Sequence, residues 1–243
     1  MAKVIIIGST SGIGLALAKL YFAKGDVVGV TGRRQHLLNS LHEQFPSQTM
    51  VECFDVMGDQ NIPHLESLIH KLGGLDVLIY NAGYGEVSES LDWSIDRQTT
   101  LTNVNGFVEV VNYTFNYFVR HGGGQIAATS SVASIRENSL APAYSASKSY
   151  MSMYLAGLYL KARRLKRKDP KTVIHISDIL PGFVKTKMAK GKGRFWEAPV
   201  DKSARQIFAA IEKKKRRTYI THRWVIIAWL LRWIPHFVVR WIA

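Results

Sequence analysis

Short apolar runs rich in β-branched residues alternate with stretches of helical periodicity along most of the chain. The first run, Lys3–Ile7, ends at Gly8, and apolar residues at helical spacing follow it from Leu15 to Tyr21. A short, continuous apolar run is typical of a parallel strand that is covered on both faces. Further strands are predicted at Val27–Thr31, Thr49–Phe54, Leu75–Tyr80, Gly124–Ser130 and Thr172–Ser177. This alternation predicts a single α/β domain with a doubly wound parallel sheet between helices.

The pattern changes after residue 219. Residues 220–243 contain four of the six tryptophans, and their longest uninterrupted apolar run, Trp224–Leu231, has eight residues. A helix that spans a bilayer needs roughly 20. Arginines and a proline interrupt the segment: Arg223, Arg232, Pro235 and Arg240. We therefore divide the chain into a domain at 1–219 and a C-terminal segment at 220–243 that does not span a membrane.

Two interpretations of the C-terminal segment remain open. Tryptophan with arginine, after the basic run Lys213–Arg217, suits a segment that lies in the interface of an anionic membrane. A helix pair packed on the domain, or across a dimer, explains the same composition. The two interpretations are compatible. We expect contact with an anionic membrane surface, and we also expect a homo-oligomer.

Length and composition limit the class of protein. The chain has 243 residues, of which 47% are hydrophobic, and this suits one domain with a sizeable core rather than a disordered chain. Cys53 is the only cysteine, so no intramolecular disulfide can form. The first strand begins at Lys3, and we expect no signal peptide. We expect a reducing, cytoplasmic setting, with peripheral contact at the inner face of a membrane.

Positive charge is concentrated in the C-terminal part of the chain. The net charge is −3 over residues 1–150 and +17 over residues 151–243, with basic clusters at 161–168, 185–194 and 213–217. This asymmetry favours an anionic partner: nucleic acid, a membrane surface or an acidic carrier. Any single cluster is explained as well by a solvated basic face. Outside the C-terminal segment, the clusters lack the interleaved aromatic residues of a surface that binds single-stranded nucleic acid, so we expect no nucleic acid as a partner.

A glycine-rich turn stands between the first strand and the first helix. Gly8, Gly12 and Gly14 are its three glycines. A turn of this kind lets backbone N–H groups and a helix N-terminus meet a diphosphate. The alternative is a tight turn that binds nothing. The strand before the turn and the helix after it favour a nucleotide site.

A tyrosine and a lysine lie four residues apart, and a serine precedes the tyrosine by thirteen residues. They are Tyr144, Lys148 and Ser131. Residues four apart share one face of a helix. An ammonium beside a phenol favours the phenolate and lowers a pKa that starts near 10. Such a tyrosine is a usable proton donor or acceptor near neutral pH, although the pair alone also occurs on ordinary helix surfaces.

Together these motifs resemble the short-chain dehydrogenase/reductase family. The glycine turn carries the G-x-x-x-G-x-G pattern of that family. The other matching motifs are Asn81-Ala82-Gly83, Asn103 with Gly106, Ser131, Tyr144 with Lys148, and Pro181-Gly182 with Val184 and Thr186. They follow the family's order and spacing over residues 3–186. Ile7 and Tyr80 depart from it, where the family often has threonine and a second asparagine, but neither change removes a group needed for chemistry.

The resemblance implies a Rossmann-like fold and hydride transfer between a nicotinamide cofactor and a carbonyl or alcohol. Tyr144 would protonate the carbonyl oxygen, and Ser131 would hydrogen-bond the same oxygen. Lys148 would lower the tyrosine pKa and hold the nicotinamide ribose, and Asn103 would link Lys148 to solvent through a water. The residues that the resemblance places at the cofactor are Gly8, Ser11, Gly12, Ile13, Gly14, Asp55, Val56, Asn81, Ala82, Gly83, Tyr144, Lys148, Pro181, Gly182, Val184 and Thr186.

The end of the second strand indicates the choice of cofactor. Arg33 and Arg34 stand there, and no acidic residue does. An acidic residue would accept the ribose hydroxyls of NAD, whereas arginine suits the 2′-phosphate of NADP. We interpret Arg33 as the main NADP selector, with Arg34 as a second contributor and an ordinary surface pair as the alternative. We expect NADPH as the cofactor, reduction as the direction, and no metal site.

The sequence says less about the substrate. The family has its substrate lid where this chain has Met188–Pro199, a short basic segment with Phe195 and Trp196. These aromatic residues, together with the C-terminal segment, favour a small hydrophobic or lipid-like ketone. One alternative is a soluble reductase of 3-oxoacyl chains on an acidic carrier. Another is a nucleotide-sensing or nucleic-acid-binding protein that keeps the fold, although such a protein would not need Ser131, Tyr144 and Lys148.

Overall fold

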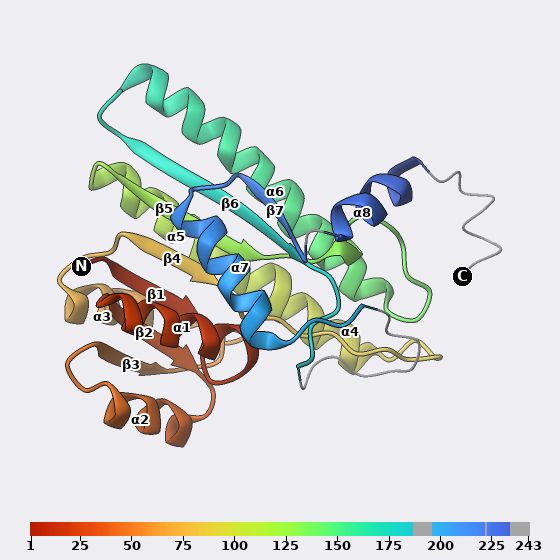
Figure 1. Cartoon of the computed structure of the whole chain (residues 1–243), viewed down its shortest axis with the longest axis horizontal. Helices are drawn as coiled ribbons and strands as arrows, with labels where there is room; N and C mark the ends of the chain where they lie inside the picture. The colour runs from red at the N-terminus through yellow and green to blue at the C-terminus, as the bar shows by residue number, and fades with distance from the viewer. Residues whose placement is uncertain (187–195, 222, 234–243) are drawn as a thin grey trace.

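The computed structural model of the protein describes residues 1–186, 196–221 and 223–233, without the side chain of Arg232. Seven strands form one parallel sheet in the order β3-β2-β1-β4-β5-β6-β7 (Figure 1). The strands are β1 (Lys3–Ile7), β2 (Val27–Gly32), β3 (Thr49–Cys53), β4 (Val77–Tyr80), β5 (Gly123–Thr129), β6 (Val173–Pro181) and β7 (Arg217–Ile220). The predicted Rossmann-like, doubly wound sheet is confirmed.

Helices cover both faces of the sheet. In the described ranges the α-helices are α1 (Gly12–Lys24), α2 (Gln35–Gln44), α3 (Asn61–Leu72), α4 (Trp93–Thr100), α5 (Gly106–Arg120), α6 (Pro142–Lys168), α7 (Val200–Glu212) and α8 (Trp224–Trp233). Buried side chains of α3, α5 and α6 form one core with the sheet. Those of α1, α2 and α7 form a second core on the opposite face.

The two cores explain why the strand sequences are continuously apolar. Alternate residues of β1 point to opposite faces, and Val4 and Ile6 join one core while Ile5 and Ile7 join the other. The six predicted strands are confirmed, with ends that shift by a few residues. The pattern does not predict β7, because this strand has only four residues and its first residue, Arg217, belongs to the basic run.

The order of the strands locates the ligand-binding end of the domain. From β1 the chain builds the sheet outward through β2 and β3, and then returns to place β4 on the other side of β1. In open α/β sheets a crevice forms at this point, beyond the carboxyl ends of the strands. The glycine turn after β1 and the loops after β4 and β5 all begin at this edge.

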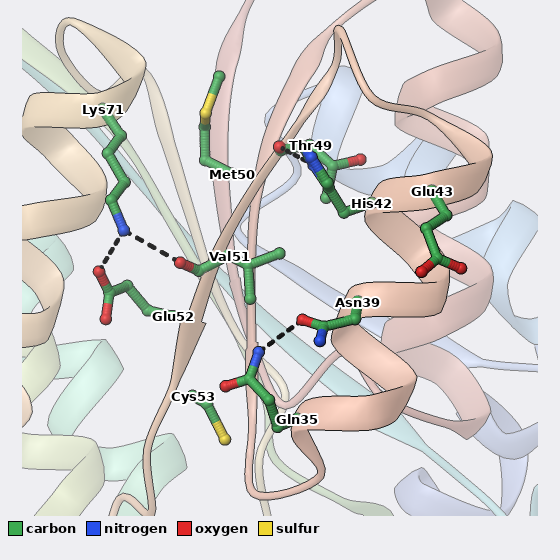
Figure 2. A pocket seen from close by; sticks show the side chains of 10 residues that line it. All are labelled: Gln35, Asn39, His42, Glu43, Thr49, Met50, Val51, Glu52, Cys53 and Lys71. Carbon is green, nitrogen blue, oxygen red and sulfur yellow. Dashed lines mark hydrogen bonds and ion pairs between the residues drawn. The ribbon is translucent and has the colours of Figure 1, made fainter.

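The outer edge of β3 is closed by side chains rather than by another strand (Figure 2). His42 Nδ1 lies 2.9 Å from the carbonyl oxygen of Thr49. Lys71 Nζ donates to the carbonyl oxygen of Val51 at 3.2 Å and pairs with the Glu52 carboxylate at 2.6 Å. A shallow pocket lies here between α2 and β3. These contacts give hydrogen-bond partners to carbonyl groups on the outer edge of β3. We therefore interpret this pocket as part of the protection of that edge and not as a ligand site.

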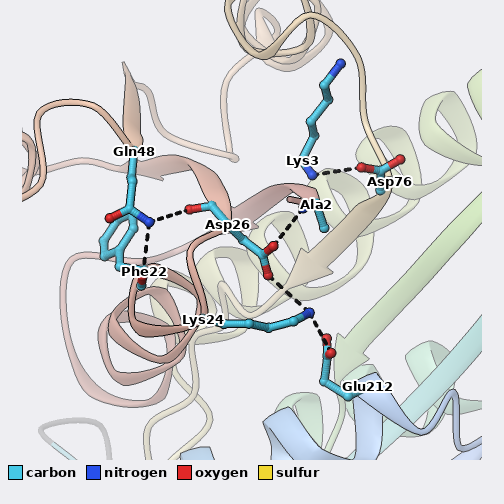
Figure 3. Close-up of polar contacts among 8 residues, drawn as sticks. All are labelled: Ala2, Lys3, Phe22, Lys24, Asp26, Gln48, Asp76 and Glu212. Carbon is cyan, nitrogen blue, oxygen red and sulfur yellow. Dashed lines mark hydrogen bonds and ion pairs between the residues drawn. The ribbon is translucent and has the colours of Figure 1, made fainter.

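Polar contacts lie at the amino-terminal ends of the strands, opposite the carboxyl ends where the crevice forms (Figure 3). The buried carboxylate of Asp26 accepts a hydrogen bond from the backbone N–H of Ala2 at 2.7 Å. Lys24 Nζ bridges Asp26 and Glu212 at 3.2 and 2.6 Å, and so ties α1 to α7. Hydrogen bonds to Glu212 and Asp26 raise the pKa of Lys24, although its small burial opposes them. This end is therefore structural, which leaves the carboxyl end of the sheet for chemistry.

The C-terminal segment begins inside the sheet, since β7 continues to Ile220. It then turns into α8, which lies beyond the carboxyl end of β7 in Figure 1. Among the helices of the described ranges, none is long and apolar enough to cross a membrane. Residues 187–195 of the predicted lid lie outside the described residues, as do Pro235, Arg240 and Trp241.

Candidate active site

The turn between β1 and α1 is held tightly enough that only glycine fits at its centre. A Cβ on Gly14 would collide with the carbonyl oxygen of Gly8, and Gly8 itself adopts a left-handed backbone with φ of +84°. Ser11 precedes the helix without capping it through its side chain, and Ile13 lies in the first turn. The N-terminus of α1 therefore stays open to a phosphate group. This arrangement fits the diphosphate of a dinucleotide cofactor.

Asn81 fastens the glycine turn to the end of β4. Its Nδ2 donates to the carbonyl oxygen of Gly8 at 3.1 Å, and its Oδ1 accepts from Thr129 Oγ1 at 3.2 Å. Ala82 follows, in contact range of Gly8. One side chain thus joins the carboxyl ends of β1, β4 and β5, where the crevice is expected.

Ser131, Tyr144 and Lys148 come together at the end of β5. Ser131 follows β5 by two residues, and the other two lie one turn apart near the start of α6. A hydrogen bond joins the Ser131 and Tyr144 side chains. Lys148 Nζ lies 5.7 Å from the centre of the Tyr144 ring and donates to the carbonyl oxygen of Thr129 at 2.9 Å. The structure therefore assembles the three predicted groups into one cluster.

Burial dominates the electrostatics of this cluster. It lowers the pKa of Lys148 to about 8, while the Asp178 carboxylate acts in the opposite direction. It raises the pKa of Tyr144, and the hydrogen bond from Ser131 only partly compensates. The predicted lowering of the tyrosine pKa is therefore not found here, because desolvation of the phenolate outweighs the stabilising contacts. Lys148 is still charged at neutral pH.

Asn103 lies in a single π-helical turn, Leu101–Asn105, that joins α4 to α5. Its Nδ2 donates to the Tyr84 carbonyl oxygen at 2.7 Å and to Ser147 Oγ at 2.9 Å, and its Oδ1 accepts from the Tyr84 N–H at 2.8 Å. The side chain thus positions the loop after β4 against α6. The Asn103 Oδ1 and Lys148 Nζ atoms both approach Gly83, so the predicted partners lie on the same side of this loop.

The two arginines after β2 have different surroundings. Arg34 Nη2 donates to Thr10 Oγ1 at 2.7 Å and to Ser11 Oγ at 2.8 Å, so its guanidinium lies over the glycine turn. Arg33 is exposed, and its Nη1 lies 3.5 Å from Asp55 Oδ2. The sequence prediction gave the leading role to Arg33, whereas the structure brings Arg34 closer to the phosphate-binding turn.

The remaining predicted residues surround the same crevice. Val56 is buried after β3, beside the Asp55 that pairs with Arg33. Thr186 approaches Gly12, so the segment after β6 reaches back to the glycine turn. Val184 is buried and forms an isolated bridge with Ala198. Pro181 ends β6 and pairs with Ile220 of β7.

Asp178 is a buried carboxylate that the motifs do not predict. It lies on β6, is 6% exposed, and accepts from Ser130 Oγ at 2.5 Å and from Ser152 Oγ at 2.9 Å. Arg217 Nε lies 3.4 Å from its Oδ2. Ser130 precedes Ser131, and Ser152 lies one turn after Lys148, so Asp178 fastens both elements of the cluster from behind. The only signal in the sequence is an acidic residue inside the apolar run of a buried strand.

Comparisons with known proteins place the chain in a family. The short chain dehydrogenase profile matches residues 2–195, which is most of the chain. An uncharacterized oxidoreductase of Staphylococcus epidermidis is 28% identical over 199 residues, covering 79% of this chain and 84% of the relative. A probable NADP-dependent dehydrogenase of Haemophilus influenzae is 27% identical over 183 residues, covering 74% and 70%.

A solved structure has the same fold. The crystal structure of a short-chain dehydrogenase from Streptomyces avermitilis superposes with a TM-score of 0.79 and 22% identity, covering 96% of this chain and 92% of that one. This likeness concerns the fold, and the match to the family profile concerns the sequence. The protein is a member of the short chain dehydrogenase family of oxidoreductases.

Proposed function

We propose that the protein is an NADPH-dependent reductase that converts a carbonyl of a small hydrophobic or lipid-like substrate to an alcohol. The observation that carries this proposal is the cluster of Ser131, Tyr144 and Lys148 beside the glycine turn. A proton donor, a hydrogen-bond donor and a buried cation meet at the ligand-binding end of the sheet. A protein that only bound a nucleotide would not need this set.

Each residue of the cluster has a distinct role in the proposed reaction. Bound NADPH supplies a hydride to the carbonyl carbon. Tyr144 gives its phenolic proton to the carbonyl oxygen, so that a neutral alcohol forms. Ser131 donates a hydrogen bond to that oxygen and positions it beside the phenol. Lys148 stabilises the phenolate that remains and binds the nicotinamide ribose, and Asn103 keeps the loop after β4 in place.

The preference for NADPH over NADH rests on the end of β2. The guanidinium of Arg34 lies over the glycine turn, and the first residues after β2 include no carboxylate that would accept ribose hydroxyls. Arginine can form charge-assisted hydrogen bonds with a 2′-phosphate. The similarity to a probable NADP-dependent dehydrogenase supports the same preference.

The hydrophobic nature of the substrate rests on the residues around the crevice. Leu140, Phe183 and Trp196 are exposed large apolar side chains, and they belong to the segments after β5 and β6. A ketone with an apolar tail would cover them. The alternative, a reductase of acyl chains on an acidic carrier, requires a basic cluster that binds the carrier near the crevice. The cluster at 161–168 lies at the far end of α6, about 25 Å or more from Tyr144 by helix length.

We also propose a homo-oligomer in a cytoplasmic setting. Tyr150, Met153 and Leu160 are exposed on α6, with Met153 at 75% and Leu160 at 62%. Burying such side chains against a second copy would remove them from water. The mass of the protein in solution, before and after Met153→Ser with Leu160→Ser, tests this surface. A monomeric wild type would contradict the proposal.

A ketone screen tests the proposed function. Purified protein is mixed with NADPH or NADH and a panel of ketones of increasing chain length, with and without phosphatidylglycerol vesicles. We expect NADPH oxidation that depends on the ketone and improves with chain length. Oxidation of NADPH without any ketone-dependent rate across the panel would contradict the proposal.

The pH dependence of the reaction should report Lys148. Because its pKa is lowered to about 8, Lys148 is charged below this pH and neutral above it. We expect kcat/KM for NADPH, which reports the free enzyme, to fall as the pH rises through about 8. The groups that face Lys148 are the Tyr144 phenol and the Asp178 carboxylate.

Asp178→Asn should move this fall to lower pH. The substitution removes the negative charge that raises the pKa of Lys148. It keeps one oxygen that can accept from Ser130, and its NH2 group replaces the oxygen that accepts from Ser152, whose hydroxyl can accept instead. The measurement is the full pH profile of the variant beside that of the wild type, with the melting temperature as the control for folding. A profile that keeps its midpoint, in a variant that melts like the wild type, would show that Asp178 has no electrostatic role.

A further inference from the structure

The C-terminal helix α8 is anchored beside the active site by its inner face. Trp224 and Ala228 are buried. The Trp224 ring packs edge-on against Phe183 at 5.6 Å, and it fills the space where a Cβ on Gly182 would stand. Gly182 belongs to the Pro-Gly motif that follows β6. Helix α8 is therefore part of the wall of the crevice.

Two arginines fasten α8 to segments on either side of the crevice. Arg136, in the loop after β5, donates from Nε to the carbonyl oxygen of Leu231 at 2.5 Å. Arg223 lies 5.1 Å from the centre of the Trp196 ring and donates from Nη2 to the Trp196 carbonyl oxygen at 3.2 Å. The helix is thus held between the loop that follows Ser131 and the end of the predicted lid.

The outer face of α8 is apolar and exposed. Trp229 is 61% exposed, Trp233 73% and Ile226 65%, and Val225 and Leu230 are also exposed. These residues turn away from Trp224 and Ala228. An amphipathic helix normally buries its apolar face, but α8 has a buried side and a second, uncovered apolar side.

Most of the large apolar side chains that the described chain exposes follow the carboxyl ends of strands. Eleven of fifteen lie in the loops after β4, β5 and β6, at the first residue of α4, or in α8, and three of the other four lie along α6. Because the strands are parallel, these segments all begin at the edge of the sheet that carries Ser131 and the glycine turn. Figure 1 shows α4 and α8 beyond that edge. The apolar residues therefore surround the active-site end, which favours a common apolar environment there.

We infer that the outer face of α8 docks on an anionic membrane surface, with the crevice opening toward the bilayer, so that a substrate dissolved in the membrane can enter directly. This inference rests on the proposed function for its substrate. Tryptophan side chains favour the boundary between hydrocarbon and water. After Glu212 the sequence contains eight Lys or Arg residues and no acidic residue, which complements anionic lipid.

The docking surface differs in one respect from the sequence prediction. The basic run Lys213–Arg217 enters β7 at its amino-terminal end, whereas α8 follows the other end. The length of β7, about 13 Å, separates them. The run therefore attracts the protein to an anionic surface at long range and does not belong to the docking face. Arg223 directly precedes α8, and Arg136 contacts it through the carbonyl oxygen of Leu231.

The test replaces only the outer face of α8. Ile226→Ser, Trp229→Ser and Trp233→Ser are combined in the full chain, which retains Trp224 and Ala228. A truncation after Thr218 is unsuitable, because it cuts β7 and removes Trp224. The comparison variant is Met153→Ser with Leu160→Ser, which changes the α6 surface proposed for the oligomer and so separates a loss of the oligomer from a loss of the outer face of α8. Each protein is sedimented with phosphatidylcholine vesicles that contain or lack phosphatidylglycerol, and its mass is measured without vesicles.

We expect the wild type and the α6 variant to sediment with the phosphatidylglycerol vesicles, and the α8 variant to bind at least about tenfold more weakly. High salt should weaken the binding. With a water-soluble ketone and no vesicles, the α8 variant should keep the wild-type rate. With a ketone dissolved in vesicles, it should lose about tenfold. Absence of turnover with normal vesicle binding would reject the proposed function and leave the docking inference standing.

Three outcomes would overturn the inference. In the first, the wild type stays in the supernatant with both kinds of vesicle at low salt. In the second, the α8 variant changes from an oligomer to a monomer while neither protein binds vesicles, which would mean that a second copy of this chain covers the outer face of α8. Equal loss of binding in the α8 variant and the α6 variant would also contradict a specific role for α8.

Discussion

Tyr144→Phe is expected to lower kcat for every accepted ketone by about 10²- to 10⁴-fold, because the ring stays in place and the transferable proton is lost. NADPH affinity should stay close to that of the wild type. The phenol is the only group of the cluster assigned to proton transfer, whereas Ser131 and Lys148 position and stabilise. The measurement is steady-state turnover together with NADPH binding by fluorescence. Tyr150→Phe is the matched control, since Tyr150 lies on the same helix but is exposed.

The companion variant Lys148→Met separates the roles of the two residues. It should reduce both turnover and NADPH affinity, because Lys148 is assigned to the electrostatics of Tyr144 and to the ribose. If Tyr144→Phe reduces a ketone at nearly the wild-type rate, the proton comes from another group. The cluster at the end of β5 would then not be the catalytic site.

Arg34→Ala should lower the preference for NADPH over NADH by about 10- to 100-fold, which corresponds to the loss of a charge-assisted phosphate contact of about 1.5–3 kcal/mol. NADH binding should change little, since NADH lacks the 2′-phosphate. Dissociation constants for both cofactors give the preference directly. Arg33→Ala should have the smaller effect, because its exposed guanidinium lies beside Asp55 rather than over the glycine turn.

Arg164→Ala is the control for a general loss of positive charge, since Arg164 is exposed on α6. Equal affinities of the wild type for NADPH and NADH would reject the selector hypothesis at once. A preference that survives in Arg34→Ala and disappears in Arg33→Ala would keep the hypothesis and reassign the phosphate to the first arginine.

The parts of the fold that the sequence predicts depend on local patterns. β1 is a continuous apolar run because both faces of the strand are buried, and the glycine turn follows it directly. Tyr144 and Lys148 share a face because they lie one helical turn apart. Such features need no knowledge of distant contacts, and the sheet that they predict is confirmed.

The features that the sequence misses depend on contacts between distant segments. β7 is a strand because Arg217–Ile220 pairs with Asp178–Pro181, which no local pattern reveals. The role of Asp178 depends on the hydrogen bonds that it accepts from Ser130 and Ser152, which lie on other elements. The raised pKa of Tyr144 depends on desolvation of its partly buried phenol, which the spacing to Lys148 does not encode.

The C-terminal segment is another part of the chain where contacts between distant residues decide the structure. Its tryptophan and arginine content suggests an interface, but the sequence cannot tell which tryptophans are available. The structure buries Trp224 against Gly182 and leaves Trp229 and Trp233 exposed. The packing and membrane interpretations therefore apply to opposite faces of one helix, and this separation permits a variant that changes one face alone.

The most direct test of the account is transfer of deuterium from NADPH that carries deuterium at both C4 positions to a ketone that the screen identifies. The account predicts one deuterium on the carbinol carbon of the alcohol made by the wild type, as measured by mass spectrometry. It predicts almost no labelled product with Tyr144→Phe, although that variant still binds NADPH. Consumption of NADPH by the wild type without label in any alcohol, over the whole ketone panel, would contradict carbonyl reduction as the function of this protein.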